Sequence, residues 1–356
     1  MVWNGSMRFN LACMPEKKLS GKKVAVIGSG PAGLVAAGFL GCSGAYVDIY
    51  DKLPEPGGLL LFAIPSNRID VEGVRDGVKE LLESYNINFI GRTKVVSSKR
   101  DVDEGDEFVK SEIGIDDIID RYHAVLISTG AWRSRSLGIS GEEYRGVFKA
   151  LDFLFRVKSG ELGYLVSDKV PVLSGKKVAV VGAGLSAVDA ASETVKMNAS
   201  KVYMLYRRTI KEAPAGEKEI RRLINTGVSW IELVIPTKIA ASGGIVKSVK
   251  LMRCKLGEPD ESGRPKPIPV EGSEFELDVD VVINCVGELP TPPIVDGELG
   301  IKLSKDGRIL VNELRETTRK GVYAAGDVVL GPSRIGLAVK EGLTAGRSIA
   351  TYLSTQ

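Results

Sequence analysis

The distribution of apolar and polar residues predicts the same unit twice along the chain. An apolar run of strand length, Val24 to Ile27, follows two lysines and ends in a glycine-rich turn, and Val178 to Val181 does the same. The surrounding segments, 20–30 and 174–184, are almost identical in sequence. A short apolar run that ends in such a turn is typical of a buried parallel strand leading into a helix.

Helical and strand patterns follow each glycine turn in the same order. Residues 34–40 have a helical pattern and residues 46–50 a strand pattern, and 188–197 and 201–206 repeat this order after the second turn. Strands that alternate with helices in this way form parallel sheets covered by helices. The sequence therefore predicts an α/β protein with two Rossmann-like, doubly wound parallel-sheet domains.

The first glycine turn has the features of a dinucleotide-binding turn. It matches G-x-G-x-x-G, and Asp51 stands at the end of the strand that follows. The first glycine permits the tight bend, the second lets a pyrophosphate approach the backbone, and the third lets helix and strand pack closely. We expect Asp51 to accept hydrogen bonds from ribose hydroxyls, and the turn residues to bind the cofactor: Gly28, Ser29, Gly30, Pro31, Ala32 and Gly33.

The second glycine turn differs at the end of its second strand, where Arg207 and Arg208 stand in place of an aspartate. An acidic residue would repel a 2′-phosphate, whereas guanidinium groups bind it with charge-assisted hydrogen bonds. The second turn is therefore predicted to bind NADPH in preference to NADH. The residues expected at this site are Gly182, Gly184, Leu185, Ser186, Ala187, Arg207 and Arg208.

Composition narrows the class of protein. A length of 356 residues suits about two domains, and a net charge of +3 does not favour binding to nucleic acid. No apolar run approaches the roughly 20 residues of a membrane span, and the first 20 residues lack the apolar core of a secretory signal, so we expect a cytoplasmic protein. The four cysteines form no C-x-x-C pair, and we expect them to be reduced, with no disulfide and no metal or iron-sulfur site.

Further motifs follow the two turns in a fixed order. They are Gly57-Gly-Leu-Leu with Ala63-Ile-Pro, Ser128-Thr-Gly-Ala, Tyr206-Arg-Arg, Asn284-Cys-Val-Gly, and Val322-Tyr-Ala-Ala-Gly-Asp with Gly331-Pro-Ser. In this order the motifs resemble the small subunit of NADPH-dependent glutamate synthase and its relatives, from about Lys22 to the C-terminus. The resemblance implies a flavoprotein that binds FAD at the first turn and NADPH at the second.

The resemblance also implies which residues lie near each cofactor. The helical segment 334–352 would direct its N-terminus at the flavin and stabilise negative charge there on reduction. Gly287 is expected on the NADPH side. Besides the first turn, the FAD site is expected to include Asp51, Lys52, Gly57, Gly58, Leu59, Ile64, Arg68, Val96, Thr129, Gly130, Ala131, Gly326, Asp327, Ser333, Arg334, Ile335 and Ala338.

The motif order predicts that the NADPH domain is inserted into the FAD domain. We expect residues 1–154 and 287–356 to form the FAD-binding domain and residues 155–286 the NADPH-binding domain. Residues 97–120, longer than in the family, are expected to be a solvated surface loop and helix, and residues 253–275 a hairpin or loop to which we assign no chemistry.

Hydride transfer between NADPH and FAD needs stacking and exclusion of water more than an acid or base. We therefore name no catalytic residue, and we expect His123 to be structural. The family carries an N-terminal iron-sulfur domain, which we expect this chain to lack, since about 20 residues precede its first strand. An iron-sulfur or glutamate-synthase-type partner subunit, or ferredoxin, would then accept the electrons. Two alternatives are a self-contained NADPH dehydrogenase or oxidase for a small acceptor, and a non-catalytic redox sensor.

Overall fold

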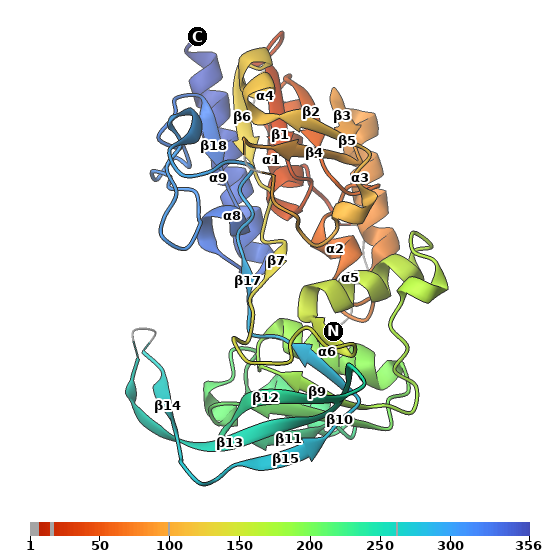
Figure 1. Ribbon diagram of the computed structural model, residues 1–356. Helices are drawn as coiled ribbons and strands as arrows, with labels where there is room; N and C mark the ends of the chain where they lie inside the picture. Colours follow the sequence, from red (N-terminus) through yellow and green to blue (C-terminus); the bar gives the residue numbers. More distant parts are fainter. Residues whose placement is uncertain (1–6, 15–17, 99, 261–262) are drawn as a thin grey trace. The chain divides into compact units, whose positions relative to one another are not determined.

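The computed structural model describes residues 7–14, 18–98, 100–260 and 263–356. The chain folds into two compact units (Figure 1). Unit 1 comprises Met1–Arg133 and Glu288–Gln356, and unit 2 comprises Ser134–Gly287. The predicted fold class is confirmed, because each unit contains a parallel sheet with helices beside it.

The sheet of unit 1 has the strand order β18-β6-β1-β2-β3, with every neighbouring pair parallel. Its first strand coincides with the apolar run from Val24 to Ile27, because a continuous apolar stretch can be buried on both faces. Its second strand coincides with the strand pattern at residues 46–50. The strands are β1 (Lys23–Ile27), β2 (Tyr46–Tyr50), β3 (Ile87–Ile90), β6 (Ala124–Ile127) and β18 (Val322–Ala324).

Among the described residues, unit 1 also contains six helices, two single 3-10 turns and a small parallel pair of strands. The helices are α1 (Pro31–Cys42), α2 (Leu59–Phe62), α3 (Val71–Ser84), α4 (Ile115–Arg121), α8 (Asp327–Leu330) and α9 (Ile335–Ser354). The 3-10 turns are η1 (Asp106–Phe108) and η4 (Glu298–Gly300), and the paired strands are β4 (Thr93–Val96) and β5 (Ser111–Gly114).

Helices α1 and α9 pack with their backbones in close approach. A Cβ atom on Gly342 of α9 would lie 2.1 Å from the carbonyl oxygen of Ala32, and one on Gly346 would lie 3.3 Å from the Cα of Ala36. Only glycine permits so short a distance between the helices. This packing fixes the start of α9 beside the glycine turn that opens α1.

Unit 2 contains a second parallel sheet with the order β11-β10-β9-β16-β8. Its strands are β8 (Val147–Lys149), β9 (Lys177–Val181), β10 (Lys201–Tyr206), β11 (Ser229–Glu232) and β16 (Val281–Asn284). Its helices are α5 (Ala150–Glu161), α6 (Leu185–Lys196) and α7 (Glu217–Ile224), with 3-10 turns η2 (Ser167–Lys169) and η3 (Ile210–Glu212).

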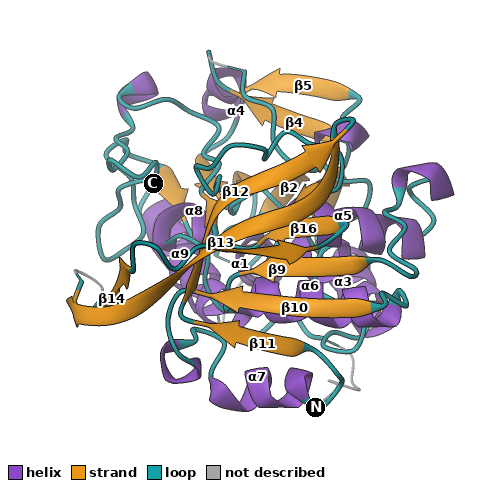
Figure 2. Ribbon diagram, turned by 60° about the horizontal axis from the view of Figure 1, so that its bottom comes forward, coloured by secondary structure: helices purple, strands orange, loops and turns teal. Residues whose placement is uncertain are grey.

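An antiparallel sheet lies against this parallel sheet (Figure 2). It contains β12 (Val234–Ser242), β13 (Ile245–Pro259), β14 (Pro265–Pro269) and β15 (Phe275–Asp278). Buried side chains of β12 and β13, including Ile239 and Val249, form one core with Val181 and Leu205 of the parallel sheet. The segment predicted as a hairpin or loop includes the β13–β14 hairpin.

The two crossings between the units run through β7 (Arg133–Ser134) and β17 (Glu288–Leu289), which pair with each other. The structure places the first crossing at residues 133/134 rather than at the expected 154/155. The reason is that β8 pairs with β16 and so joins the sheet of unit 2. Because β8 is only three residues long, its apolar pattern did not indicate which sheet it would join.

The prediction that all four cysteines are reduced is wrong for two of them. Cys13 and Cys42 form a disulfide with a Cα–Cα distance of 5.6 Å, while Cys254 and Cys285 are buried free thiols. Residues 7–14 pass beside α1, where a Cβ atom on Gly38 would lie 2.5 Å from the carbonyl oxygen of Phe9. This tertiary path brings Cys13 to Cys42, at the end of α1. Among the described residues, no helix is long and apolar enough to span a membrane.

Candidate functional site

The glycine turn between β1 and α1 is closely packed on one side. Gly28 has a φ of 101°, and a Cβ atom there would lie 2.4 Å from the carbonyl oxygen of Ser128. A Cβ atom on Gly33 would lie 2.0 Å from the carbonyl oxygen of Gly28. Both glycines are therefore required by the protein itself, for the bend and for the close packing of α1 on β1.

Gly30 lies on the open side of the same turn. Its φ is −69°, which any residue adopts, and apart from its chain neighbours no atom of the described residues lies within 4 Å of the Cβ that an alanine would add. The protein alone gives no reason for glycine here. Gly30 is also the N-cap of α1, where backbone N–H groups lack partners within the helix and favour an anion. The turn fits a pyrophosphate group in contact with the backbone.

Asp51 links the turn to the end of β2. Its Oδ2 accepts hydrogen bonds from the Ser29 N–H and hydroxyl, both at 2.6 Å, and its Oδ1 accepts one from the Leu53 N–H at 2.9 Å. A carboxylate has about four lone-pair sites. The side chain is thus held in a fixed orientation with capacity for a further donor, such as a ribose hydroxyl.

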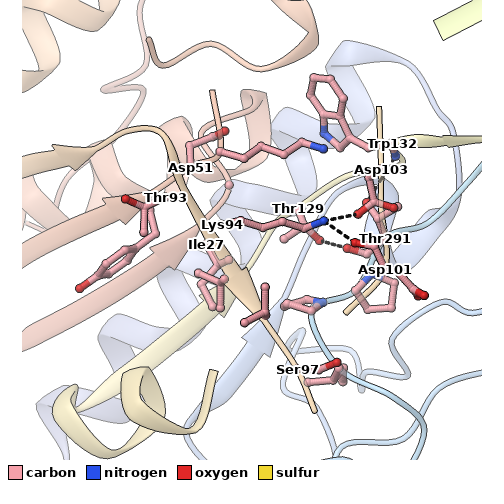
Figure 3. A pocket seen from close by; sticks show the side chains of 18 of the residues that line it. Ile27, Asp51, Thr93, Lys94, Ser97, Asp101, Asp103, Thr129, Trp132 and Thr291 are labelled. Carbon is pink, nitrogen blue, oxygen red and sulfur yellow. Dashed lines mark hydrogen bonds and ion pairs between the residues drawn. The ribbon is translucent and has the colours of Figure 1, made fainter. Parts of the chain in front are cut away.

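Two cavities of unit 1 share four residues: Gly28, Asp51, Thr129 and Trp132. The first is lined by Lys94, which Figure 3 shows, and also by Lys52 and Val96. The second extends along the glycine turn to the start of α9. The two cavities together offer an elongated site with Asp51 between its ends.

Asp327 and Ser333 line the second cavity where α8 begins. The Ser333 hydroxyl donates a hydrogen bond to Asp327 at 2.6 Å. Burial raises the pKa of Asp327, although that hydrogen bond opposes the shift. Gly326 has a φ of 79°, which turns the chain so that Asp327 enters the cavity.

The structure brings most of the predicted FAD-site residues to these cavities. Lys52 and Val96 line the first cavity, and Thr129 lines both. The second cavity is lined by Gly30, Pro31, Ala32, Gly58, Leu59, Ile64, Gly130, Gly326, Asp327, Ser333, Arg334, Ile335 and Ala338. The predicted residues that do not line either cavity are Ser29, Gly33, Gly57, Arg68 and Ala131.

The residues that sequence reasoning missed come mainly from two loops. Trp132 lines both cavities, and its backbone N–H donates to the Thr291 hydroxyl at 3.3 Å. Thr291, in the loop after the second crossing, also accepts a hydrogen bond at its carbonyl oxygen from the Thr129 hydroxyl at 2.8 Å. Trp132 stands directly after a recognised motif, whereas nothing in the local sequence marks Thr291.

The second glycine turn, in unit 2, repeats the geometry of the first. Gly182 has a φ of 135°, and a Cβ atom there would lie 2.4 Å from the carbonyl oxygen of Cys285. Gly184 has a φ of −81° and, like Gly30, open space where its Cβ would be. Leu185 and Ser186 begin α6 at the surface, and Ala187 is buried. Gly287, with a φ of 111°, ends the segment after β16.

The two arginines after β10 have different environments. Arg208 is 1% exposed, donates to the carboxylate of Asp260 at 2.6 Å and to the carbonyl oxygen of Pro265 at 2.7 Å, and so holds the β13–β14 hairpin. Arg207 is exposed. The expectation that both guanidinium groups grip a phosphate is therefore revised, because the guanidinium of Arg208 is already bound to Asp260.

His123 has a structural contact. Its Nδ1 accepts a hydrogen bond from the Lys23 N–H at 3.0 Å, which ties the start of β6 to the start of β1. The starts of parallel strands lie at the sheet edge opposite the glycine turn.

A parallel α/β fold with two such glycine turns is typical of proteins with two dinucleotide-binding domains. The chain belongs to the pyridine nucleotide-disulphide oxidoreductase family, whose model matches residues 22–342.

Two relatives illustrate the similarity. The chain is 37% identical over 344 residues to the NADP(+)-dependent formate dehydrogenase subunit beta of Moorella thermoacetica, covering 94% of this chain and 44% of that subunit. It is 33% identical over 347 residues to the glutamate synthase [NADPH] small chain of Escherichia coli, covering 96% of this chain and 70% of the relative. The resemblance to glutamate synthase small subunits is thereby confirmed.

Solved structures show the same fold. FprA from Mycobacterium tuberculosis in complex with NADPH matches with a TM-score of 0.73 at 19% identity, over 94% of this chain and 85% of that one. Thioredoxin reductase from T. acidophilum matches with a TM-score of 0.66 at 22% identity, over 93% of this chain and 99% of that one. Family and relatives together make this chain an FAD-dependent NAD(P)H oxidoreductase that binds FAD and NADPH.

Proposed function

We propose that unit 1 holds FAD, that unit 2 holds NADPH, and that the chain passes electrons between NADPH and a partner subunit or other acceptor. The observation that carries this proposal is the pair of open glycines. At Gly30 and at Gly184 the surrounding protein gives no reason for the missing side chain, which supports a ligand in contact with each turn. Their strand ends differ, since Asp51 follows the first turn and Arg207 follows the second.

The proposal assigns the parts of FAD along the elongated site of unit 1. The pyrophosphate would contact the backbone at Gly30, and the ribose would donate to Asp51. The adenosine would lie in the cavity lined by Lys94 and Val96, and the ribityl chain beside Asp327. The isoalloxazine would lie at Ser333 to Ala338, where the N-terminus of the 20-residue helix α9 favours negative charge.

FAD supplies the redox chemistry when bound: it accepts the hydride of NADPH and returns electrons to an acceptor. The residues of the chain bind and orient the cofactors and exclude water, and no side chain is needed as an acid or base. On the NADPH side, Arg207 would bind the 2′-phosphate. Arg208 would not contact the phosphate; it would hold the β13–β14 hairpin in place.

The names of the relatives support a partner subunit, because several are single subunits of larger enzymes. The chain spans about half the length of the first of these relatives, so their acceptors are not carried over. The acceptor, the partner and a cytoplasmic location stay predictions. We favour an iron-sulfur protein as the partner, because a flavin can accept the two electrons of a hydride and pass them on one at a time, and iron-sulfur clusters accept single electrons.

The decisive experiment uses Gly30→Ala and Gly184→Ala as a matched pair. Both alanines fit the protein, since φ is negative and the Cβ position is open at each site. Gly30→Ala is expected to lose FAD and keep NADP⁺ binding. Gly184→Ala is expected to keep FAD, seen as its yellow colour, and to need higher concentrations of NADPH before the flavin absorbance is bleached. Loss of both ligands in one variant, or of neither in both, would contradict the assignment.

The acceptor is tested with the wild-type protein. Anaerobic NADPH should bleach the flavin absorbance, and failure to bleach with NADPH or NADH would favour the redox sensor. The reduced protein is then mixed with ferredoxin, with oxygen or a quinone, or with polysulfide. Rapid reoxidation by ferredoxin supports a partner-linked role, whereas turnover with oxygen or quinone alone supports a self-contained dehydrogenase or oxidase.

A further inference from the structure

A loop rich in acidic residues lies at one side of the first cavity. We call residues 101–108 the acidic cap; it contains Asp101, Asp103, Glu104 and Asp106 and ends in the 3-10 turn η1. Asp101 and Asp103 line the cavity beyond Lys94 (Figure 3). The sequence predicted that this segment is solvated, but Asp103 and Phe108 are largely buried.

Three cationic side chains of the cavity wall hold the acidic cap. Lys94 Nζ donates to the Asp101 carbonyl oxygen at 2.7 Å and to the Asp103 carboxylate at 3.2 Å, and is ion-paired to Asp106. Lys52 Nζ donates to the Glu104 carbonyl oxygen at 2.6 Å and lies 3.1 Å from the Asp106 carboxylate.

Arg133 and Trp132 hold the other side of the cap. Arg133 lies 2.6 Å from the Asp103 carboxylate and 3.3 Å from that of Asp101. The carbonyl oxygen of Trp132 accepts a hydrogen bond from the Glu104 N–H at 3.0 Å, and the Lys52 ammonium lies 4.4 Å from the centre of its ring. Trp132 therefore connects the cap to both cavities.

The charges of this network are mostly removed from water. The side chains of Lys52, Lys94, Asp103 and Asp106 are between 9% and 18% exposed. Burial would by itself raise the pKa of Asp106, but the ammonium groups of Lys52 and Lys94 outweigh it and lower that pKa. Burying ion pairs costs desolvation free energy, so a network of this kind is a poor way merely to stabilise a loop.

The network does, however, define the shape and charge of the cavity wall. Among the described residues, the ion pairs that hold the cap join three cations and three carboxylates. The charged side chains that line the cavity also balance, at three of each sign with Asp51 included, and a wall without net charge suits an uncharged adenosine rather than a phosphate. The ion pairs also neutralise the ammonium groups of Lys52 and Lys94, which would otherwise face the ligand as unpaired charges.

We propose that the acidic cap is a latch on the adenosine end of the FAD site, and that its ion pairs determine how tightly FAD is retained. This inference rests on the proposed placement of FAD in unit 1. Asp106 is the central positioning residue, because it pairs with both lysines and also accepts a hydrogen bond from the Asp103 N–H at 2.9 Å.

The test measures the dissociation constants of FAD and of ADP for the apoprotein, with NADP⁺ saturating the second unit. ADP shares the adenosine and pyrophosphate of FAD but lacks the flavin. In Asp106→Asn we expect both constants to rise by the same factor, at least about tenfold, because each of two buried ammonium groups loses a carboxylate partner. General loosening of unit 1 would instead weaken FAD much more than ADP, since FAD contacts the whole site.

Two controls separate the latch from charge loss and from instability. Asp117→Asn removes a carboxylate of α4 that is 57% exposed, paired with Arg121 and outside both cavities; its constants should equal those of the wild type. Val78→Ala removes buried volume from α3, away from both cavities, and should lower stability without an equal loss of ADP.

A double-mutant cycle tests the coupling within the latch. Lys94→Met combined with Asp106→Asn should weaken FAD less than the sum of the single effects, because the two substitutions remove each other's unpaired charge. If Asp106→Asn does not fold, Asp101→Asn provides the test, since Asp101 is 40% exposed and pairs with Arg133 at the outer end of the network. We expect a two- to threefold rise there, about 0.4–0.7 kcal/mol.

Two results would overturn the proposed latch. In one, the dissociation constants of Asp106→Asn for FAD and ADP stay within about twofold of the wild-type values. In the other, this variant loses affinity for FAD but not for ADP. Either result differs from failure of the proposed function. A wild-type protein that binds FAD but is not bleached by NADPH contradicts electron transfer and leaves the effect of Asp106→Asn measurable.

Discussion

The different environments of Arg207 and Arg208 predict different consequences for two neighbouring substitutions. Arg207→Ala removes an exposed guanidinium that we propose contacts the 2′-phosphate of NADPH. Arg208→Ala removes a guanidinium that is 1% exposed and already bound to Asp260 and Pro265. The first substitution should change cofactor preference, and the second should change stability.

The magnitudes follow from the two kinds of contact. A hydrogen bond to a charged group contributes about 1.5–3 kcal/mol, so Arg207→Ala should lower kcat/KM for NADPH about 10- to 150-fold and leave NADH nearly unchanged. Breaking a buried ion pair costs about 3–5 kcal/mol. The carboxylate of Asp260 is 31% exposed and can regain water, so for Arg208→Ala we expect about 3 kcal/mol of lost stability.

The assay is steady-state reduction of ferricyanide with NADPH and with NADH, together with urea unfolding of each variant. Arg207→Lys serves as a conservative control that keeps the charge and loses the planar pair of donors. An unchanged NADPH to NADH ratio in Arg207→Ala would refute the role of Arg207. A stable Arg208→Ala protein that has lost NADPH preference would show instead that Arg208 reaches the phosphate.

Three further predictions concern unit 1. Cys13→Ser should lower the free energy of unfolding by about 3.6 kcal/mol, which is the loop-closure term for a disulfide across 29 residues, and reductant should no longer change the Tm. Four titratable thiols in the unreduced, unfolded wild type would contradict the disulfide. Asp327→Asn should stabilise the apoprotein at neutral pH but not at pH 4, because burial raises the pKa of Asp327 and the resulting loss of stability begins only as pH rises above the ordinary value of 3.8. FAD should bind more weakly to this variant. An apoprotein that is less stable than the wild type in urea at neutral pH would refute the stability prediction. Gly77→Ala, which in a free helix gains about 1 kcal/mol, should destabilise α3 because its Cβ would lie 1.6 Å from the carbonyl oxygen of Met7, and a rise in Tm would reject that contact.

Local sequence was sufficient wherever one segment specifies its own structure. The apolar runs beginning at Val24 and Val178 predicted β1 and β9, because a run that is apolar on both faces is stable only inside a parallel sheet. The glycine turns predicted the bends at Gly28 and Gly182, where a positive φ leaves glycine as the favoured residue. Asp51 and Arg207 were predicted to bind ligands from their position alone, since strand ends in this fold lie beside the ligand. The structure places Asp51 at both cavities of unit 1 and leaves Arg207 exposed.

The sequence by itself therefore determined the two parallel sheets, their glycine turns and the chemical difference between their strand ends. Tertiary structure decided which sheet β8 joined, that Cys13 meets Cys42, that Arg208 is bound to Asp260, and that the acidic cap is held by Lys52 and Lys94. Each of these depends on residues far apart in the chain. Side-chain type shows that a charge needs a partner or water, but only the folded path of the backbone decides which of the two it finds.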